Sequence, residues 1–143
     1  MRVALDTDVI VAAVRSRIGA SNALMRALRH GQLAAVASVP MMLEYEAVLM
    51  RTEHRRVSGL SVAQVQHFMD GLAAVLIPVT PHFLWRPTLR DPDDEMVVDA
   101  AVNGQAEAIV TFNVRDFLPG ARQFQLDVLT PAQTLRRLYG TNQ

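Results

Sequence analysis

Apolar residues follow two alternating patterns along this chain. The first pattern is a short, nearly continuous apolar run, which is typical of a buried strand. It occurs at residues 2–6, 33–39, 76–79, 106–112 and 124–130. The second pattern has apolar residues at helical spacing between helix start and stop signals. It occurs at residues 21–31, 40–51, 61–76, 91–104 and 130–140.

Start and stop residues strengthen the predicted helices. Ser, Asp and Thr side chains accept hydrogen bonds from the first backbone N–H groups of a helix, proline fits the first turn, and glycine ends a helix. We expect N-caps at Ser21, Ser61, Asp91 and Thr130, prolines in first turns at 40, 92 and 131, and glycines after last turns at 31 and 104.

The alternation of strands and helices predicts the fold class. It indicates an α/β protein whose mostly parallel sheet is covered by helices on both faces. We expect residues 1–143 to form one domain, because this length is sufficient to bury a core and is typical of a single unit. In such folds ligands bind outside the carboxyl ends of the strands.

Two carboxylates interrupt the first apolar run, "VALDTDVIVAAV" at residues 3–14. An unpaired buried carboxylate is costly, so such groups normally pair or hold a metal ion. Asp6 ends the predicted strand, and no structural role explains an acid at that position. For Asp8 the alternative is an N-cap of a helix that follows the strand.

Three further segments carry acids toward the same predicted edge of the sheet. Glu44 lies one turn into the helix after the second strand, and Asn113 and Asp116 follow the strand that contains residues 106–112. The cluster "DPDDE" at residues 91–95 opens the helix before that strand. Each has a structural alternative: an exposed helix position for Glu44, capping for residues 91–95, and a turn for Asn113 and Asp116.

Converging carboxylates predict a metal site. Like charges a few ångströms apart raise each other's pKa, and a hard divalent ion relieves that repulsion. Mg²⁺ and Mn²⁺ prefer oxygen ligands. A bound ion lowers the pKa of a water and neutralises charge on a phosphoryl oxygen. The pattern therefore favours an enzyme that cleaves phosphodiester bonds.

Composition narrows the chemistry further. The chain has no cysteine, which excludes disulfides and thiolate zinc sites. Its formal net charge is zero, so we expect no general basic coat. All 14 basic residues are arginine, whose planar fork can still bind phosphate locally. We expect a cytoplasmic protein, because the start does not resemble a signal peptide and no uncharged apolar stretch could cross a bilayer.

Histidines and aromatics add no second site to this interpretation. The histidines, at positions 30, 54, 67 and 82, are scattered without ligand spacing. Phe83 and Trp85 are interpreted as a packing patch, with a base-stacking platform as the alternative.

Three stretches resemble the successive motifs of PIN-domain proteins: "LDTDVIVAAV", "SVPMMLEYEAVLMR" and "DPDDEMVVDAAVNGQAEAIVTFNVRDF". The likeness spans nearly the whole chain and is strongest to toxin components related to VapC toxins. The resemblance implies a three-layer α/β/α sandwich and a Mg²⁺- or Mn²⁺-dependent ribonuclease. Its acidic quartet corresponds to Asp6, Glu44, Asp94 and Asp116.

The resemblance also implies roles for individual residues. Asp6, Asp94 and Asp116 would hold one or two ions, with Asp91 and Glu95 as alternates for the third acid. Glu44 would orient or deprotonate the attacking water. Thr7 and Thr111 match small polar positions beside the acids, and Thr111 and Asn113 would position a ligand or a phosphate oxygen. Because Arg115 lies beside the site in sequence, it would contact the substrate backbone, with a solvated side chain as the alternative. Asp8 departs from the pattern, since many relatives carry Asn there.

The resemblance implies partners as well. Family members are usually homodimers, and toxin-type members are inhibited by an antitoxin whose segment enters the acidic groove. A catalytically weak module that only binds RNA or an antitoxin is the main alternative. A phosphatase of the haloacid dehalogenase type also carries an Asp-x-Asp loop, but its chemistry requires a lysine, and this chain has none.

Overall fold

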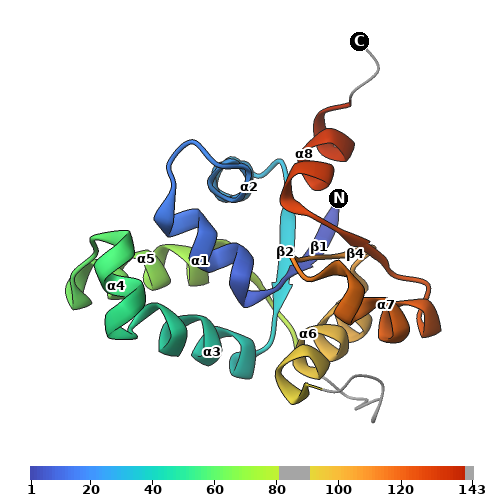
Figure 1. Ribbon diagram of the computed structural model, residues 1–143. Coiled ribbons are helices and arrows are strands. Elements are labelled where there is room, and N and C mark those ends of the chain that lie inside the picture. The colour runs from blue at the N-terminus through green and yellow to red at the C-terminus, as the bar shows by residue number, and fades with distance from the viewer. Residues whose placement is uncertain (81–90, 141–143) are drawn as a thin grey trace.

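The structure is a computed structural model that describes residues 1–80 and 91–140 (Figure 1). The predictions for His82, Phe83 and Trp85 lie outside the described residues. Within the described ranges, no helix has the length and apolar character needed to cross a membrane.

Five parallel strands form one sheet in the order β3-β2-β1-β4-β5. The strands are β1 (Arg2–Leu5), β2 (Ala34–Ala37), β3 (Ile77–Pro78), β4 (Ala108–Val110) and β5 (Asp127–Leu129). Each falls within one of the five predicted apolar runs. The central strand, β1, pairs Ala4 with Val36 of β2 and with Ile109 of β4, so its carboxyl end is flanked by the ends of both neighbours.

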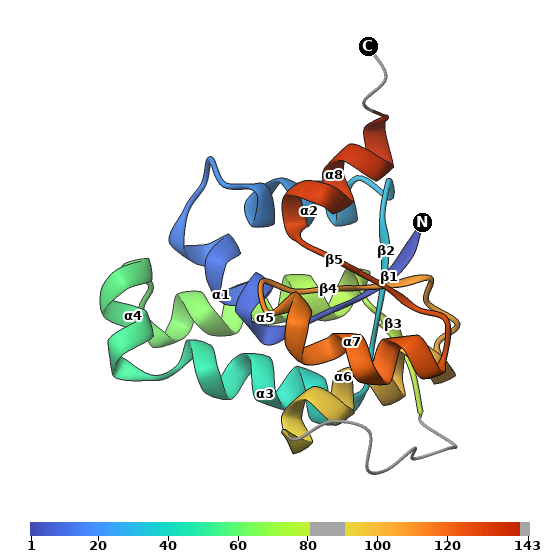
Figure 2. The ribbon, with the colours of Figure 1, turned by 45° about the vertical axis from the view of Figure 1, so that its right-hand side comes forward.

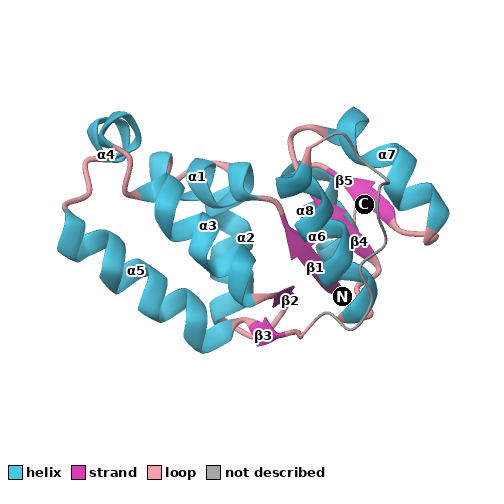
Figure 3. Cartoon of the chain, turned by 90° about the horizontal axis from the view of Figure 1, so that it is seen from below, coloured by secondary structure: helices cyan, strands magenta, loops and turns pink. Residues whose placement is uncertain are grey.

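The helices are α1 (Thr7–Arg15), α2 (Ala20–Arg29), α3 (Val39–Leu49), α4 (Thr52–Ser58), α5 (Val62–Val75), α6 (Pro92–Asn103), α7 (Val114–Gln123) and α8 (Pro131–Tyr139). Helices α6 and α7 lie on one side of the sheet, and α2 and α8 lie on the other (Figures 1 and 2). Seen from below, α6 crosses β1 and β4, while α1, α3, α4 and α5 form a group beside them (Figure 3). The predicted three-layer α/β/α sandwich is confirmed.

Local capping explains most helix starts. Ser61 and Thr130 each form a capping box with the glutamine three residues later, and Asp91 accepts from the backbone N–H of Asp93. Ser38 caps α3 by accepting from the N–H of Met41 at 3.3 Å. The predicted caps at residues 61, 91 and 130 are therefore confirmed.

One cap prediction, at Ser21, and one structural alternative, the cap at Asp8, are wrong. Helix α2 begins two residues earlier than expected, with Gly19 as its N-cap, because the side chain of Ser21 is only 3% exposed and faces the interior. Helix α1 is capped by Asp6 and not by Asp8. Asp8 lies in the first turn of α1, where its carboxylate accepts hydrogen bonds from the segment after β4 instead.

The core lies around the sheet and includes buried residues of α1, α2, α3, α5 and α6. Val3, Ala4, Leu5, Val36 and Ile109 are fully buried. Gly104 ends α6 as predicted and brings it against β2. A Cβ atom at this position would lie 2.9 Å from the Val36 side chain. Glycine is therefore required here by close packing rather than by an unusual backbone conformation.

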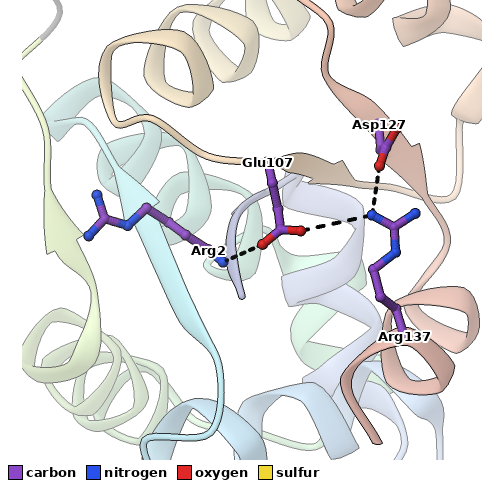
Figure 4. A network of polar contacts seen from close by, with 4 residues as sticks. All are labelled: Arg2, Glu107, Asp127 and Arg137. Carbon is purple, nitrogen blue, oxygen red and sulfur yellow. Dashed lines mark hydrogen bonds and ion pairs between the residues drawn. The ribbon is translucent and has the colours of Figure 1, made fainter. Parts of the chain in front are cut away.

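An ion-pair network lies at the amino edge of the sheet (Figure 4). Nη1 of Arg137 in α8 donates to Oδ2 of Asp127 at 2.6 Å and lies 4.0 Å from Oε2 of Glu107. The backbone N–H of Arg2 donates to Oε1 of Glu107 at 3.4 Å. The acids that precede β4 and begin β5 thus have arginine partners.

Candidate active site

Asp6 lies at the carboxyl end of β1 and contacts both the start of α1 and the segment after β4. Its backbone N–H donates to Val110 O at 2.9 Å, which extends the pairing of β1 with β4. Its Oδ1 accepts from the N–H of Thr7 at 2.8 Å, and its Oδ2 accepts from the hydroxyl of Thr111 at 2.7 Å. Only 9% of Asp6 is exposed. The strand end, the helix start and the neighbouring strand therefore fix one nearly buried carboxylate.

Asp8 holds the segment that follows β4. Its Oδ2 accepts from the backbone N–H of Phe112 at 3.0 Å and lies 3.4 Å from Nδ2 of Asn113. The N–H of Asn113 donates to the Thr111 hydroxyl at 2.9 Å. Oδ1 of Asp8 is buried, and no donor among the described residues reaches it. Asp8 is thus both a tether for residues 111–113 and a source of one unpaired acceptor at the site.

Tyr45 fixes the position of Glu44. It is 1% exposed, and its hydroxyl donates to Leu5 O at 2.5 Å, immediately before Asp6. Burial and then the charge of Asp6 raise the pKa of Tyr45, which keeps the hydroxyl a donor. The contact of Tyr45 therefore places the partly exposed Glu44, the preceding residue of α3, near the carboxyl end of β1.

The pKa shifts show that these carboxylates influence one another. Burial and then the charge of Asp6 raise the pKa of Asp8 to about 7. Burial, followed by the charges of Asp6, Asp91, Asp116 and Asp93, raises the pKa of Asp94 to about 7.

The same effects act on Asp6 and Glu44. Burial raises the pKa of Asp6, although its hydrogen bonds to Thr111 and Thr7 oppose the shift. Burial and then Asp93 raise the pKa of Glu44, and Arg51 opposes them. Segments from four parts of the chain thus form one electrostatic unit.

The candidates for the third acid, Asp94, Asp91 and Glu95, differ in exposure and in contacts. Asp94 is partly exposed in the first turn of α6 and is electrostatically coupled to Asp6. Asp91 already caps α6 by accepting from Asp93 N at 2.9 Å. Glu95 is 3% exposed, so little of it is open to an ion in solvent. Asp91 and Asp94 are both accessible and both coupled to Asp6, and the capping contact of Asp91 is the difference that favours Asp94.

The remaining predicted site residues lie on the segment after β4. Asn113 is the N-cap residue of α7, but its side chain makes no capping hydrogen bond and is directed to Asp8 instead. Asp116 is exposed in the first turn of α7, where its charge raises the pKa of Asp94. Arg115 is exposed beside it. The turn expected for Asn113 and Asp116 is therefore the start of a helix.

The donor set suits a hard divalent ion. It consists of carboxylate oxygens whose mutual repulsion an ion would relieve, and it includes the unpartnered Oδ1 of Asp8. Within residues 1–80 and 91–140, no three His, Cys, Asp or Glu side chains are arranged to hold an ion together. Mg²⁺ keeps several waters and usually takes one or two carboxylates directly. An ion at this edge would therefore be held directly by one or two of these carboxylates and otherwise through water.

The contributions of Asp8 and Tyr45 were not predicted from the sequence. Both act through contacts between residues 40 or more positions apart, Tyr45 with Leu5 and Asp8 with Phe112. A local pattern contains no signal for such pairs. The one available hint was the second carboxylate of "DTD", which the cap hypothesis explained incorrectly.

Comparison with known proteins identifies the family. Residues 2–115 match the PIN domain family. A crystal structure of VapBC2 from Rickettsia felis bound to a DNA fragment from their promoter has a similar fold, with a TM-score of 0.64 and 14% sequence identity. That match covers 91% of this chain and 98% of the other. No curated protein sequence matches significantly. Because the family match covers most of its length, this chain belongs to the PIN domain family.

Proposed function

We propose that this protein is a ribonuclease that hydrolyses RNA phosphodiester bonds with Mg²⁺ or Mn²⁺. The observation that carries the proposal is the electrostatic coupling of acids from four segments at the carboxyl edge: Asp6, Glu44, Asp94 and Asp116. Empty of cations, such an edge repels a phosphate. With a divalent ion it attracts one, so the same residues support both ion binding and substrate binding.

Each acid has a proposed role. Asp6, Asp94 and Asp116 would hold the ion, directly or through water. A bound divalent ion supplies a water of lowered pKa and neutralises charge on a phosphoryl oxygen. Glu44, partly exposed and with a raised pKa, would orient the attacking water or accept its proton.

Neighbouring residues would position these groups. The N–H of Thr7 and the hydroxyl of Thr111 hold the Asp6 carboxylate in one orientation. Asn113 is proposed to orient a ligand or a phosphate oxygen, and the exposed Arg115 to contact the RNA backbone.

We further propose that the protein acts in the cytoplasm as the toxin of a toxin–antitoxin pair and forms a homodimer. The likeness of its fold to VapBC2 supports this assignment. An antitoxin segment would enter the acidic edge. Growth arrest on expression, relieved by the product of an adjacent small gene, would support the pair, and harmless expression would count against it.

The test measures cleavage of unstructured RNA with Mn²⁺, with Mg²⁺ and with EDTA. We expect metal-dependent cleavage that Asp6→Asn reduces at least about 100-fold, since oxygen ligands and the charge are lost together. The matched control is Asp127→Asn, the same change at the amino edge, which should leave the rate unaltered. Cleavage that persists in EDTA or in Asp6→Asn would exclude the proposed mechanism. RNA binding without cleavage would indicate a binding module.

A further inference from the structure

Phe112 is an exposed aromatic residue at the acidic edge of the sheet. It follows Thr111 after β4, and 52% of its surface is accessible to solvent. Within residues 1–80 and 91–140, the other exposed aromatic residue is Tyr139. Phe117, five positions later, is fully buried. The segment thus buries one ring and leaves the other in water beside the site.

Hydrogen bonds to the acids fix the backbone on both sides of this ring. The N–H of Phe112 donates to Asp8 at 3.0 Å, and the hydroxyl of Thr111 donates to Asp6 at 2.7 Å. The N–H of Asn113 closes a turn onto Thr111 at 2.9 Å. A rigid aromatic side chain on a fixed backbone loses little conformational entropy when it contacts a ligand. Phe112 is therefore pre-organised relative to Asp6.

Exposed apolar residues also lie on the other side of Asp6. Val39 and Leu43 open α3 directly after β2, and they are 69% and 61% exposed. Strands β2, β1 and β4 are consecutive neighbours, so the ends of β2 and β4 lie roughly 10 Å apart with Asp6 between them. Apolar surfaces therefore flank the acidic cluster on two sides.

These apolar surroundings favour contact with bases, in addition to the backbone contact proposed for Arg115. Backbone recognition relies on cations, whereas the face of a base stacks on an aromatic ring without regard to its sequence. We propose that Phe112 stacks on an unpaired base next to the scissile phosphate. In a duplex, each base face is covered by its neighbours and is closed to the ring. The inference rests on the proposed ribonuclease activity.

The test uses an unstructured oligoribonucleotide that carries 2-aminopurine, a base whose fluorescence falls when it stacks. We expect Phe112→Ala to weaken binding and cleavage roughly 5- to 100-fold, as for the loss of one base–aromatic stack, and to abolish the quenching. Phe112→Trp should retain both properties. Phe112→Leu, apolar but without a ring, should resemble Phe112→Ala. Light scattering on each variant monitors the association state.

Tyr139→Ala is the matched control. Tyr139 is 57% exposed, and its hydroxyl donates to Gln32, which lies before β2 at the amino edge. Its loss should leave RNA binding unchanged.

A series of oligonucleotides, each lacking one base, completes a double-mutant cycle. Where the stacked base is missing, Phe112→Ala should have no further effect.

The outcomes separate this inference from the proposed function. Metal-dependent cleavage that is equal in wild type and Phe112→Ala would overturn the inference and leave the ribonuclease intact. Quenching that depends on Phe112 without any cleavage would retain the stacking role and overturn the ribonuclease. An oligonucleotide that neither binds nor is cut overturns both. A change in the association state of Phe112→Ala, without a change in RNA affinity, would place the ring in a protein–protein interface instead.

Discussion

The carboxylates at the two edges of the sheet have opposite surroundings. At the amino edge, Asp127 and Glu107 lie within 4.0 Å of the Arg137 guanidinium (Figure 4). At the carboxyl edge, no arginine of the described ranges forms an ion pair with Asp6, Asp8, Glu44 or Asp94. Burial and mutual repulsion raise the pKa of all four.

Under the proposed function, this difference separates stabilising charges from charges kept for a ligand. A carboxylate paired with arginine favours the folded state in its ionised form, whereas a carboxylate with a raised pKa disfavours it. A protein retains the second kind of group when a bound partner repays the cost, and such perturbed groups cluster at functional sites. The contrast between the edges can be tested by making the same type of substitution at each edge and comparing the effects on cleavage and stability.

The largest expected effect distinguishes Asp94 from Asp91. Asp94→Asn should reduce the cleavage rate at least about 100-fold, because it removes a carboxylate coupled to Asp6. The same change should not lower the melting temperature of the metal-free protein at neutral pH, because it also removes repulsion. Asp91→Asn is the matched variant: Asn caps helices about as well as Asp, so folding should persist and the rate should fall far less. The reverse ranking would assign the third ligand to Asp91.

A smaller effect is expected in the pH dependence of stability. Asp8 and Asp94 have pKa values raised from 3.8 to about 7. Between these values the native state binds more protons than the unfolded state, so their contribution to stability falls as pH rises. A divalent ion competes with those protons. Saturating Mn²⁺ should therefore raise the melting temperature by about 5–10 °C above pH 7 and much less near pH 5.

Calorimetry with and without Mn²⁺, on wild type and Asp94→Asn, measures this dependence. The metal-free variant should lose less stability than wild type as pH rises, because one of the carboxylates with a raised pKa is absent. An equal Mn²⁺ effect at both pH values would contradict the assignment of the ion to these carboxylates.

The fold was largely predictable because its signals are local. The strands are short apolar runs, and the helices after Ser61, Asp91 and Thr130 begin where a side chain can accept from the first turn. Parallel strands bring their carboxyl ends to one edge, so Asp6 and the segment around Asn113 were expected together. Helices α4 and α7 were not predicted. The first buries no residue, and the second contains Pro119.

The details of the site depend on contacts that no local pattern records. A helix cap was one of two interpretations of Asp8, but Asp6 takes that role and Asp8 accepts from Phe112, 104 positions away. The sequence yielded no prediction for Tyr45, whose hydroxyl ties α3 to β1. The residue types indicate which chemistry such a site could perform, whereas tertiary packing decides which of them touch.

The smallest expected effect concerns the ion pair at the amino edge. The side chains of Arg137 and Asp127 are 42% and 57% exposed, and solvent weakens their attraction. A double-mutant cycle with Arg137→Gln and Asp127→Asn should give a coupling free energy of about 0.2–1 kcal/mol, declining as salt rises. Urea unfolding at low and high salt measures it. Because this pair lies far from the acidic edge, neither variant should alter RNA cleavage. A change in cleavage comparable with that of Asp94→Asn would mean that the two edges are energetically coupled. It would contradict the separate roles assigned to them.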